Sequence, residues 1–296
     1  MWSELRRSAI AAVVLLFIAP ATLAQVVSPA GTMDVMFTVQ HSHIDTHTNR
    51  HGDTAHDIDL RSTIATVNVE YSLTDRWAVG VAVPYIQSRY RGPAPHHGAV
   101  VDDGRMHGSL QDLQVDLRYG VTRGHTLLTP FAAFRYPMRD YPTLGHAAPG
   151  RGLRELEFGV SAGRQFLTHP NAVFGANVAY VYSEELHDIR VNRTLADVQL
   201  GYVVTDRLFV RAFGAWQVSH GGLDLPLPPQ SEHFHHHDQL ARANYTRAGG
   251  GFVYSLTDRF DLHAAYATVL RSVNAHKGRS VSIGVNWTFA PGSDGY

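Results

Sequence analysis

The chain has 296 residues, with 25 basic and 26 acidic side chains and a formal net charge of −1. This balance argues against a nucleic-acid partner, which normally requires a basic patch. Cysteine is absent, which excludes disulfides, thiolate metal sites and cysteine nucleophiles. The 19 histidines are many for a chain of this length.

Residues 1–24 have the pattern of a secretory signal peptide. Arg6 and Arg7 precede the apolar run Ala9–Ala19, which is short for a membrane span. We expect cleavage after Ala24, with an uncleaved anchor as the alternative, and a single mature domain over residues 25–296. After residue 25 no apolar stretch reaches the ~18 residues that a helical span needs.

A turn motif recurs along the mature chain. The pattern Tyr-x-x-Thr-Asp-Arg is found at residues 71–76, 202–207 and 254–259, with degenerate copies at 119–123 and 166–170. Thr and Asp favour tight turns because their short polar side chains hydrogen-bond the local backbone. The aromatic residue before each turn suits a membrane–water interface. We therefore expect five short connections.

Between these turns, apolar and polar residues alternate with a period of two. From Trp77 to Tyr85, one face carries Trp, Val and Tyr, whereas the other carries Ala, Gly and Pro. Residues 112–119 and 281–289 alternate in the same way. This period predicts strands whose two faces lie in different environments. A β-sandwich would bury the apolar face, whereas a membrane barrel turns it towards lipid.

Three features favour the barrel. Aromatic residues gather near the strand ends, the polar face carries both signs of charge, and short turns alternate with longer linkers. We therefore predict an all-β fold: an antiparallel up-and-down transmembrane β-barrel of about 12 strands, in the cell outer membrane of a Gram-negative bacterium. Ten or fourteen strands are the alternatives. The strands are expected to begin near Met33, Asp59, Trp77, Leu110, Thr126, Leu153, Ala172, Arg193, Leu208, Ala241, Phe260 and Arg279.

Six longer extracellular loops would join these strands. They are expected at residues 44–58, 91–109, 138–151, 185–192, 220–240 and 272–278, which are rich in Gly, Pro, His and Asp. Short periplasmic turns with longer outer loops are characteristic of outer-membrane barrels.

Residues 71–85, which read YSLTDRWAVGVAVPY, are followed by GSLQDL at 108–113 and by Arg118-Tyr119. This combination resembles the outer-membrane transporter proteins of the meta-pathway of phenol degradation family. The resemblance is specific over residues 65–120 and diffuse elsewhere. It implies a barrel and the passage of small, often hydrophobic solutes, and it supplies no residue-level substrate motif.

Many of the histidines fall in the expected outer loops. Imidazole binds Zn, Cu, Ni and Co, and a neighbouring carboxylate can complete such a site. These residues have no fixed zinc-motif spacing, so a hydrated polar surface is the competing interpretation. The candidate metal ligands are His41, His43, His47, His51, His56, His233, His235, His236, His237 and Asp238.

The polar faces of the strands carry charges that would line the lumen. They would either select solutes by sign or fill a narrow barrel with salt bridges. This set comprises Asp34, Glu70, Asp112, Asp116, Arg118, Arg135, Glu155, Glu157, Asp197, Arg211, Asp261 and His263. On the other face, the expected lipid-facing anchors are Trp77, Tyr85, Tyr180, Trp216, Trp287 and Phe289.

Two functions remain open at this point. The first is porin-like passage of small solutes, which include hydrophobic or aromatic compounds and metal ions. The second is a plugged barrel whose His-rich loops bind transition-metal ions or a partner without transport. We expect no enzyme, because serine–histidine neighbours such as Ser219 and His220 arise by chance among so many histidines. The expected partners are outer-membrane lipid and a small solute or metal ion, with no nucleic acid and no cofactor beyond a weakly bound loop metal.

Overall fold

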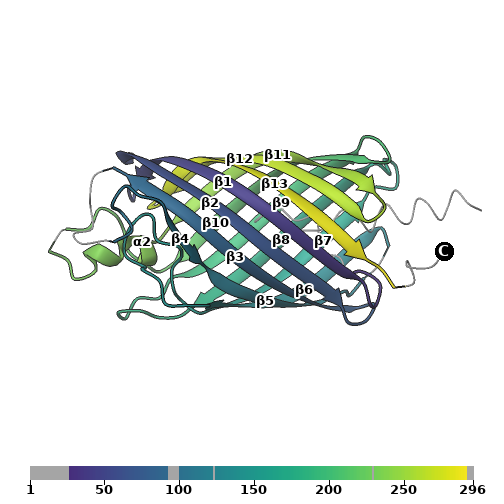
Figure 1. Cartoon of the computed structure of the whole chain (residues 1–296), viewed down its shortest axis with the longest axis horizontal. Helices are drawn as coiled ribbons and strands as arrows, with labels where there is room; N and C mark the ends of the chain where they lie inside the picture. Colours follow the sequence, from purple (N-terminus) through teal and green to yellow (C-terminus); the bar gives the residue numbers. More distant parts are fainter. Residues whose placement is uncertain (1–26, 93–99, 123, 229, 292–296) are drawn as a thin grey trace, which may run out of the picture.

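The alternating segments of the sequence form the strands of one closed antiparallel sheet (Figure 1). The computed structural model describes residues 27–92, 100–122, 124–228 and 230–291. The expected signal peptide therefore lies outside the described residues. The strands are β1 (Met33–Thr48), β2 (Thr54–Ser72), β3 (Trp77–Arg91), β4 (His107–Leu110), β5 (Asp112–Tyr119), β6 (Thr126–Pro137), β7 (Glu155–Gln165), β8 (Ala172–Ser183), β9 (Asn192–Val203), β10 (Leu208–His220), β11 (Asn244–Thr257), β12 (Phe260–Val273) and β13 (His276–Phe289).

The sheet closes because β1 pairs with both β2 and β13, and β2 also pairs with β3. β4 and β5 both pair with β3 and flank Gln111, so they form one interrupted strand of a barrel with 12 strands. Closure gives the long strands hydrogen-bonded neighbours on both sides, which a lipid environment requires, whereas the short β4 pairs with β3. The predicted fold class and strand number are confirmed. Among the described residues, no helix is long and apolar enough to cross a membrane.

The apolar faces of the strands point outward. Trp77, Tyr85, Tyr180, Trp216 and Trp287 are each about two-fifths or more exposed, and valines and leucines cover the wall between them. A β-sandwich would have buried these side chains, so the alternative soluble fold is excluded. Polar side chains occupy the interior, as in membrane barrels.

The recurrent turns follow one local geometry. The hydroxyl of Thr74 accepts hydrogen bonds from the backbone N–H groups of Arg76 and Trp77, at 3.1 and 3.0 Å. Thr205 accepts from Arg207 and Leu208 at 3.2 and 3.0 Å, in the same arrangement. The threonine of the motif therefore fixes these turns, as the sequence indicated.

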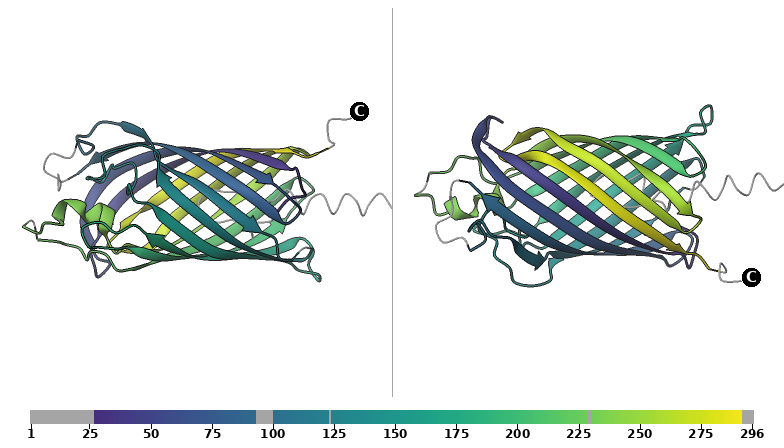
Figure 2. Two further views of the ribbon diagram at one scale, coloured as in Figure 1. Left: turned by 90° about the horizontal axis from the view of Figure 1, so that it is seen from below. Right: turned by 45° about the horizontal axis from the view of Figure 1, so that its top comes forward.

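A small cap closes the opposite end of the barrel, where the long loops lie (Figures 1 and 2). It consists of the loop 138–154 and of residues 221–243, which include the 3₁₀ turn η1 (Phe234–His236) and the helix α2 (His237–Leu240). Buried Leu153, Val191 and Leu240 pack together and hold the cap on the barrel.

Two of the six expected outer loops are much shorter than predicted. β1 and β2 extend far enough to leave only residues 49–53 between them, and β12 and β13 are joined through residues 274 and 275. The prediction that His41, His43, His47 and His56 lie in a loop is therefore wrong, because these four residues belong to β1 and β2. Strand pairing continues past the apolar belt because Thr, Ile and Val support a strand even where polar residues alternate with them.

A bulge in β1 changes which residues face inward. In the part of β1 before the bulge, the even-numbered residues Asp34, Met36 and Thr38 are buried. The register to β13 shifts by one at Asp45, between the pairs Ile44↔Gly278 and Thr46↔Lys277. A bulge inserts one extra residue and reverses the alternation beyond it. The odd-numbered His47 consequently faces the interior and is buried.

Candidate functional site

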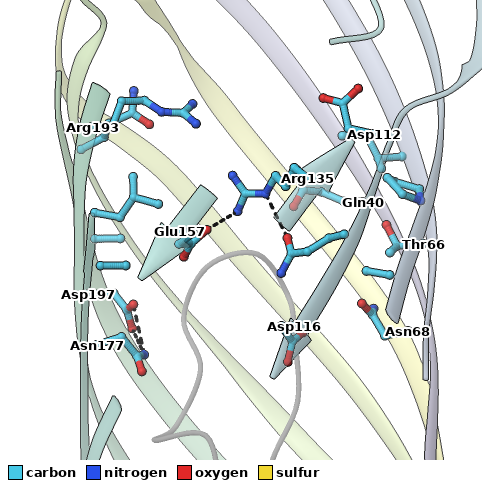
Figure 3. A pocket seen from close by; sticks show the side chains of 18 of the residues that line it. Gln40, Thr66, Asn68, Asp112, Asp116, Arg135, Glu157, Asn177, Arg193 and Asp197 are labelled. Carbon is cyan, nitrogen blue, oxygen red and sulfur yellow. Dashed lines mark hydrogen bonds and ion pairs between the residues drawn. The ribbon is translucent and has the colours of Figure 1, made fainter. Parts of the chain in front are cut away.

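The interior of the barrel holds a cavity of about 540 Å³. Both signs of charge line it: Asp112, Asp116, Glu157 and Asp197 are acidic, and Arg135, Arg193 and Arg247 are basic. Gln40, Thr66, Asn68 and Asn177 add uncharged polar groups. Figure 3 labels all of these residues except Arg247 and shows the labelled side chains converging from opposite parts of the wall.

Hydrogen bonds fix many of the lining groups. Arg135 donates to Gln114 at 3.0 Å and to Glu157 at 2.7 Å. Across the cavity, the amide of Asn177 donates to both carboxylate oxygens of Asp197, at 2.9 and 3.1 Å (Figure 3). Groups held in this way present defined charges to a solute, rather than mobile ones.

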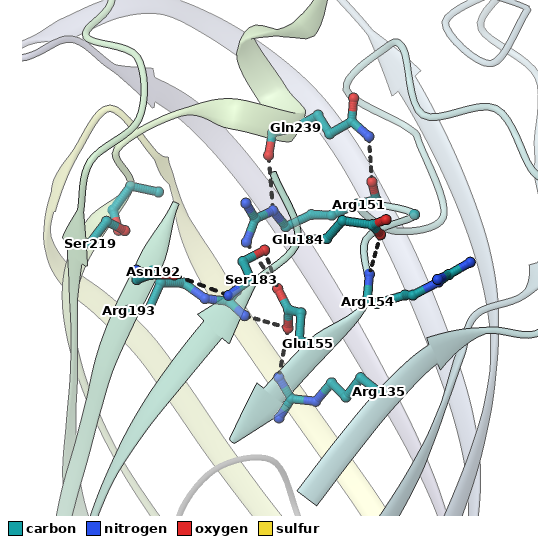
Figure 4. A network of polar contacts seen from close by, with 12 residues as sticks. Arg135, Arg151, Arg154, Glu155, Ser183, Glu184, Asn192, Arg193, Ser219 and Gln239 are labelled. Atoms are coloured by element: carbon teal, nitrogen blue, oxygen red, sulfur yellow. Dashed lines mark hydrogen bonds and ion pairs between the residues drawn. The ribbon is translucent and has the colours of Figure 1, made fainter. Parts of the chain in front are cut away.

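A network of arginines forms the roof of the cavity (Figure 4). Glu155 accepts hydrogen bonds from Arg193 at 2.5 Å, from Arg151 at 3.1 Å and from Arg135 at 3.3 Å. Arg151 also donates to the backbone carbonyl of Gln239 at 2.9 Å, and the Gln239 amide donates back to the carbonyl of Arg151 at 2.5 Å. Burial and the neighbouring Arg193 lower the pKa of Arg151 to about 10, against the opposing pull of Glu155. Arg151, itself part of the cap, therefore ties the two segments of the cap to each other and, through Glu155 of β7, to the barrel wall.

The floor of the cavity, at the short-turn end, is an ion-pair cluster. Arg118 is 1 % exposed and pairs with Glu70, and its Nε lies 2.7 Å from an Asp116 oxygen. A Cβ on Gly80 would lie 2.5 Å from the Asp116 carboxylate, so only glycine leaves room for this group. Asp34 and Asp261 are also buried at this end. These buried side chains lie in the barrel interior below the cavity.

The charges predicted to face the lumen all belong to the interior. Asp34, Glu70, Asp116, Arg118, Glu155, Glu157, Asp197, Asp261 and His263 are buried, and Asp112, Arg135 and Arg211 are partly buried. Four of them line the cavity together with Arg135, namely Asp112, Asp116, Glu157 and Asp197. Sequence reasoning missed Arg151, Arg193 and Arg247. Arg193 and Arg247 lie on strands whose alternation is weak at those positions, and Arg151 lies in a loop.

The candidate metal ligands separate into two groups. His41 and His43 precede the β1 bulge and face outward. His41 contacts Thr63 at 3.0 Å, and His43 contacts Asp59 at 3.2 Å. His51 lies in an exposed turn, and the described residues do not include the side chain of His56. His233, His235 and His236 lie on or beside η1, partly exposed.

Among the described side chains of the predicted set, His47, His237 and Asp238 come together. They meet His146 and His276, which the sequence did not single out. His146 lies in a loop that was predicted, but nothing local distinguishes it from other loop histidines. The triads His47–Asp238–His276 and His146–His237–Asp238 each hold ligand atoms within 4.8 Å of one another, so these residues are able to hold a metal ion.

Ser219 and His220 form no hydrolase-like pair. The hydroxyl of Ser219 donates to the carbonyl of Ala243 at 2.7 Å, whereas His220 contacts Thr194 at 2.8 Å. A nucleophilic serine requires a base within hydrogen-bond reach of its hydroxyl, and the partners of Ser219 do not supply one.

Comparisons with known proteins identify the fold. No family model matches the sequence, and no curated protein matches it either. An outer-membrane channel from Pseudomonas putida F1 superposes with a TM-score of 0.69 at 15% identity, covering 92% of this chain and 100% of that one. The translocator domain of the autotransporter NalP from Neisseria meningitidis has a TM-score of 0.52 at 11% identity, with 88% and 90% covered. The chain therefore has the fold of the outer-membrane β-barrels of Gram-negative bacteria.

Proposed function

We propose that the chain is an outer-membrane barrel that lets small solutes cross, and that it belongs with the transporter proteins of the meta-pathway of phenol degradation family. One observation carries the proposal. A barrel with an apolar outer wall encloses a charged cavity of about 540 Å³. A barrel whose only task was structural would gain more stability by filling this space with packed side chains.

The lining favours small polar or charged solutes over hydrocarbons. Carboxylates and guanidinium groups alternate around the cavity, and an apolar solute would have to displace the water that hydrates them. A solute with both a charged and an apolar part suits the site, because Phe131, Ile64 and Leu195 line it as well. Size and charge thus set the selectivity.

The cap and roof lie above the cavity, and the buried Arg118 cluster lies below it. We infer that side chains at the two ends must move for a solute to pass. We expect small single-channel currents with frequent closures, rather than the steady current of a wide pore.

The test uses purified protein in planar bilayers and in liposomes. Conductance, with uptake of small charged solutes exceeding that of uncharged ones of equal size, would support the proposal. Refolded barrels with no current and no uptake would contradict it. The second candidate function would then stand: a plugged barrel whose outer surface binds a metal ion or partner without transport. The closed cap is the observation that favours this alternative.

A further inference from the structure

Four histidines from four separate parts of the chain converge beneath the cap. His47 comes from β1, His276 from β13, His146 from the loop 138–154 and His237 from α2. The ring centroid of His47 lies 5.4 Å from that of His146, 6.1 Å from that of His237 and 4.9 Å from that of His276. His146 lies 5.6 Å from His237 and 5.5 Å from His276, measured in the same way.

The carboxylate of Asp238 lies among these four imidazoles. Oδ1 of Asp238 is 3.0 Å from Nδ1 of His146 and 3.6 Å from Nε2 of His237. Both triads with metal-ligand geometry share this residue. One carboxylate among four imidazoles is a ligand set that suits Zn²⁺ and related ions.

The cluster is buried, which is unusual for histidine. His47, His146 and His237 are 4%, 6% and 6% exposed. Histidine is commonly found only partly buried, and imidazoles placed inside a protein need polar partners. Three buried imidazoles and one carboxylate therefore face one another in the interior of the protein.

The hydrogen bonds around the cluster orient its ligands. Nδ1 of His237 lies 2.6 Å from the carbonyl oxygen of Phe234, which can only accept. Nδ1 therefore carries the proton, and in the neutral ring the lone pair is on Nε2, the atom that faces Asp238. Such a bond from the second imidazole nitrogen to a carbonyl is characteristic of metal-binding histidines.

The loop that carries His146 is held in the same way. The carboxylate of Asp102 accepts from the backbone N–H groups of His146 and Ala147, each at 2.9 Å. The ring of Tyr90 packs on that of His146 with centroids 4.6 Å apart. These contacts position the histidine before any ion arrives.

The spacing of the rings fits a tetrahedral ion. With Zn–N bonds of about 2.0 Å, imidazoles around one ion have centroids roughly 5 Å apart and ligand nitrogens roughly 3.3 Å apart. The five centroid separations lie between 4.9 and 6.1 Å. Within each of the two triads the ligand atoms lie within 4.8 Å of one another, so side-chain rotation has to bring them closer for one ion to bind.

We propose that His47, His146, His237, His276 and Asp238 form a binding site for one transition-metal ion of the Zn²⁺ class, in which four of the five groups coordinate the ion at one time. The ion would join the barrel wall, through His47 and His276, to the cap, through His146, His237 and Asp238. It would therefore lock the cap in place. The site does not depend on whether the barrel conducts.

A second histidine group supplies a matched control. The ring of His187 lies 4.4 Å from that of His236 and 6.1 Å from that of His233. His187 is exposed and the other two are partly exposed, on the same cap as His237. Substitutions there remove imidazoles from the cap and leave the buried cluster intact.

The experiment titrates Co²⁺ into chelator-treated protein that was purified without a histidine tag. Tetrahedral Co²⁺ absorbs visible light far more strongly than octahedral Co²⁺. We expect one strongly absorbing ion per chain, displaced by Zn²⁺. His237→Gln and His146→Gln should each weaken binding by more than about tenfold, whereas His233→Gln and His236→Gln should bind as the wild type does. All variants must first show the heat-modifiable gel mobility of a folded barrel.

X-ray absorption of the Zn²⁺-loaded wild type uses no variant, so its result does not depend on whether a variant folds. It should show a four-coordinate shell with imidazole scattering. An octahedral Co²⁺ spectrum, an oxygen-only zinc shell, or equal losses in the control variants would overturn the site.

Discussion

His47 of β1 lies directly opposite His276 of β13, with ring centroids 4.9 Å apart, although 229 positions separate them in the sequence. The closure of the barrel, which pairs the first described strand with the last, brings them together. The bulge at Asp45 turns His47 inward to meet its partner. The β1–β13 pair that closes the barrel therefore also supplies two ligands, His47 and His276, of the proposed metal site.

Zinc should stabilise the folded barrel. An ion that binds only the native state adds about 2.7 kcal/mol to the free energy of unfolding when its free concentration is 100 times its Kd. The temperature at which the protein loses its folded gel mobility should rise with Zn²⁺ and fall back with chelator. His237→Gln should abolish the rise and His233→Gln should retain it. Equal shifts in both variants would contradict the site.

Arg118→Met should strongly destabilise the barrel. It leaves Glu70 and Asp116 buried without their guanidinium partner, and breaking a buried ion pair typically costs about 3–5 kcal/mol. Urea unfolding in detergent measures the loss. Arg164→Met, on the exposed face of β7, is the control and should change little. A loss as small as that of the control would show that the floor cluster adds no stability.

Arg151→Ala should loosen the cap. It removes the hydrogen bond to the Gln239 carbonyl and the ion pair with Glu155. If the cap limits passage, single-channel conductance and solute uptake should both rise. Arg154→Ala is the matched control, since this arginine of the same loop is exposed and packs on the ring of Tyr136. Unchanged uptake in a folded Arg151→Ala barrel would rule out the cap as the barrier.

Ion selectivity should follow the charges of the cavity. Glu157→Gln removes a negative group beside Arg135, so the reversal potential in a salt gradient should shift towards anions. Arg135→Gln should shift it towards cations, because Glu157 and Glu155 then lose a positive neighbour. Arg271→Gln, on the exposed face of β12, should have no effect. Shifts of the same sign in both cavity variants would place the ion path elsewhere.

Asp224 anchors the cap, because it accepts hydrogen bonds from Arg242 of the cap and from Asn274 beside β12, and this anchor should weaken in acid. A hydrogen bond from Arg242 lowers the pKa of Asp224 below its ordinary value of 3.8; burial opposes this shift, and a hydrogen bond from Asn274 adds to it. A lowered carboxyl pKa stabilises the fold above the unfolded value, and this stabilisation is lost as the pH falls through the lowered one.

Hydrogen exchange measures this loss at two nearby amides. Leu223 N–H donates to Leu240 and Arg242 N–H donates to Leu223, at 2.8 and 2.9 Å. Protection factors corrected for pH should fall below about pH 4 and should already be low at neutral pH in Asp224→Asn. The control Asp206→Asn lies in a turn at the other end of the barrel and should keep them. Protection that is independent of pH in the wild type would count against the anchor.

Much of the fold follows from local patterns in the sequence. Alternation with a period of two separates Trp77 and Tyr85 from the interior and places Asp116 and Glu157 inside. The threonine turns mark where strands meet at one end. The starts predicted at Met33, Trp77, Thr126, Ala172, Leu208 and Phe260 coincide with those of the structure. Each of these features depends on neighbours in the chain, which the sequence shows directly.

The composition of the histidine cluster depends on contacts between distant segments. His47 is inward only because the bulge at Asp45 reverses the alternation, and a bulge has no signature in the residues 44–46 themselves. His146 and His276 join it because the cap folds over the mouth and the first strand pairs with the last. The length of the outer strands likewise reflects pairing with neighbours, which the polar composition of residues 44–58 conceals.

The sequence by itself thus determined the barrel fold and which residues face its interior or the lipid, because a strand has two faces and the alternation of side chains distinguishes them. The tertiary structure alone decided which charges share the cavity and which histidines meet beneath the cap. Those groupings arise from register, closure and loop packing, which are properties of the whole sheet rather than of any one segment.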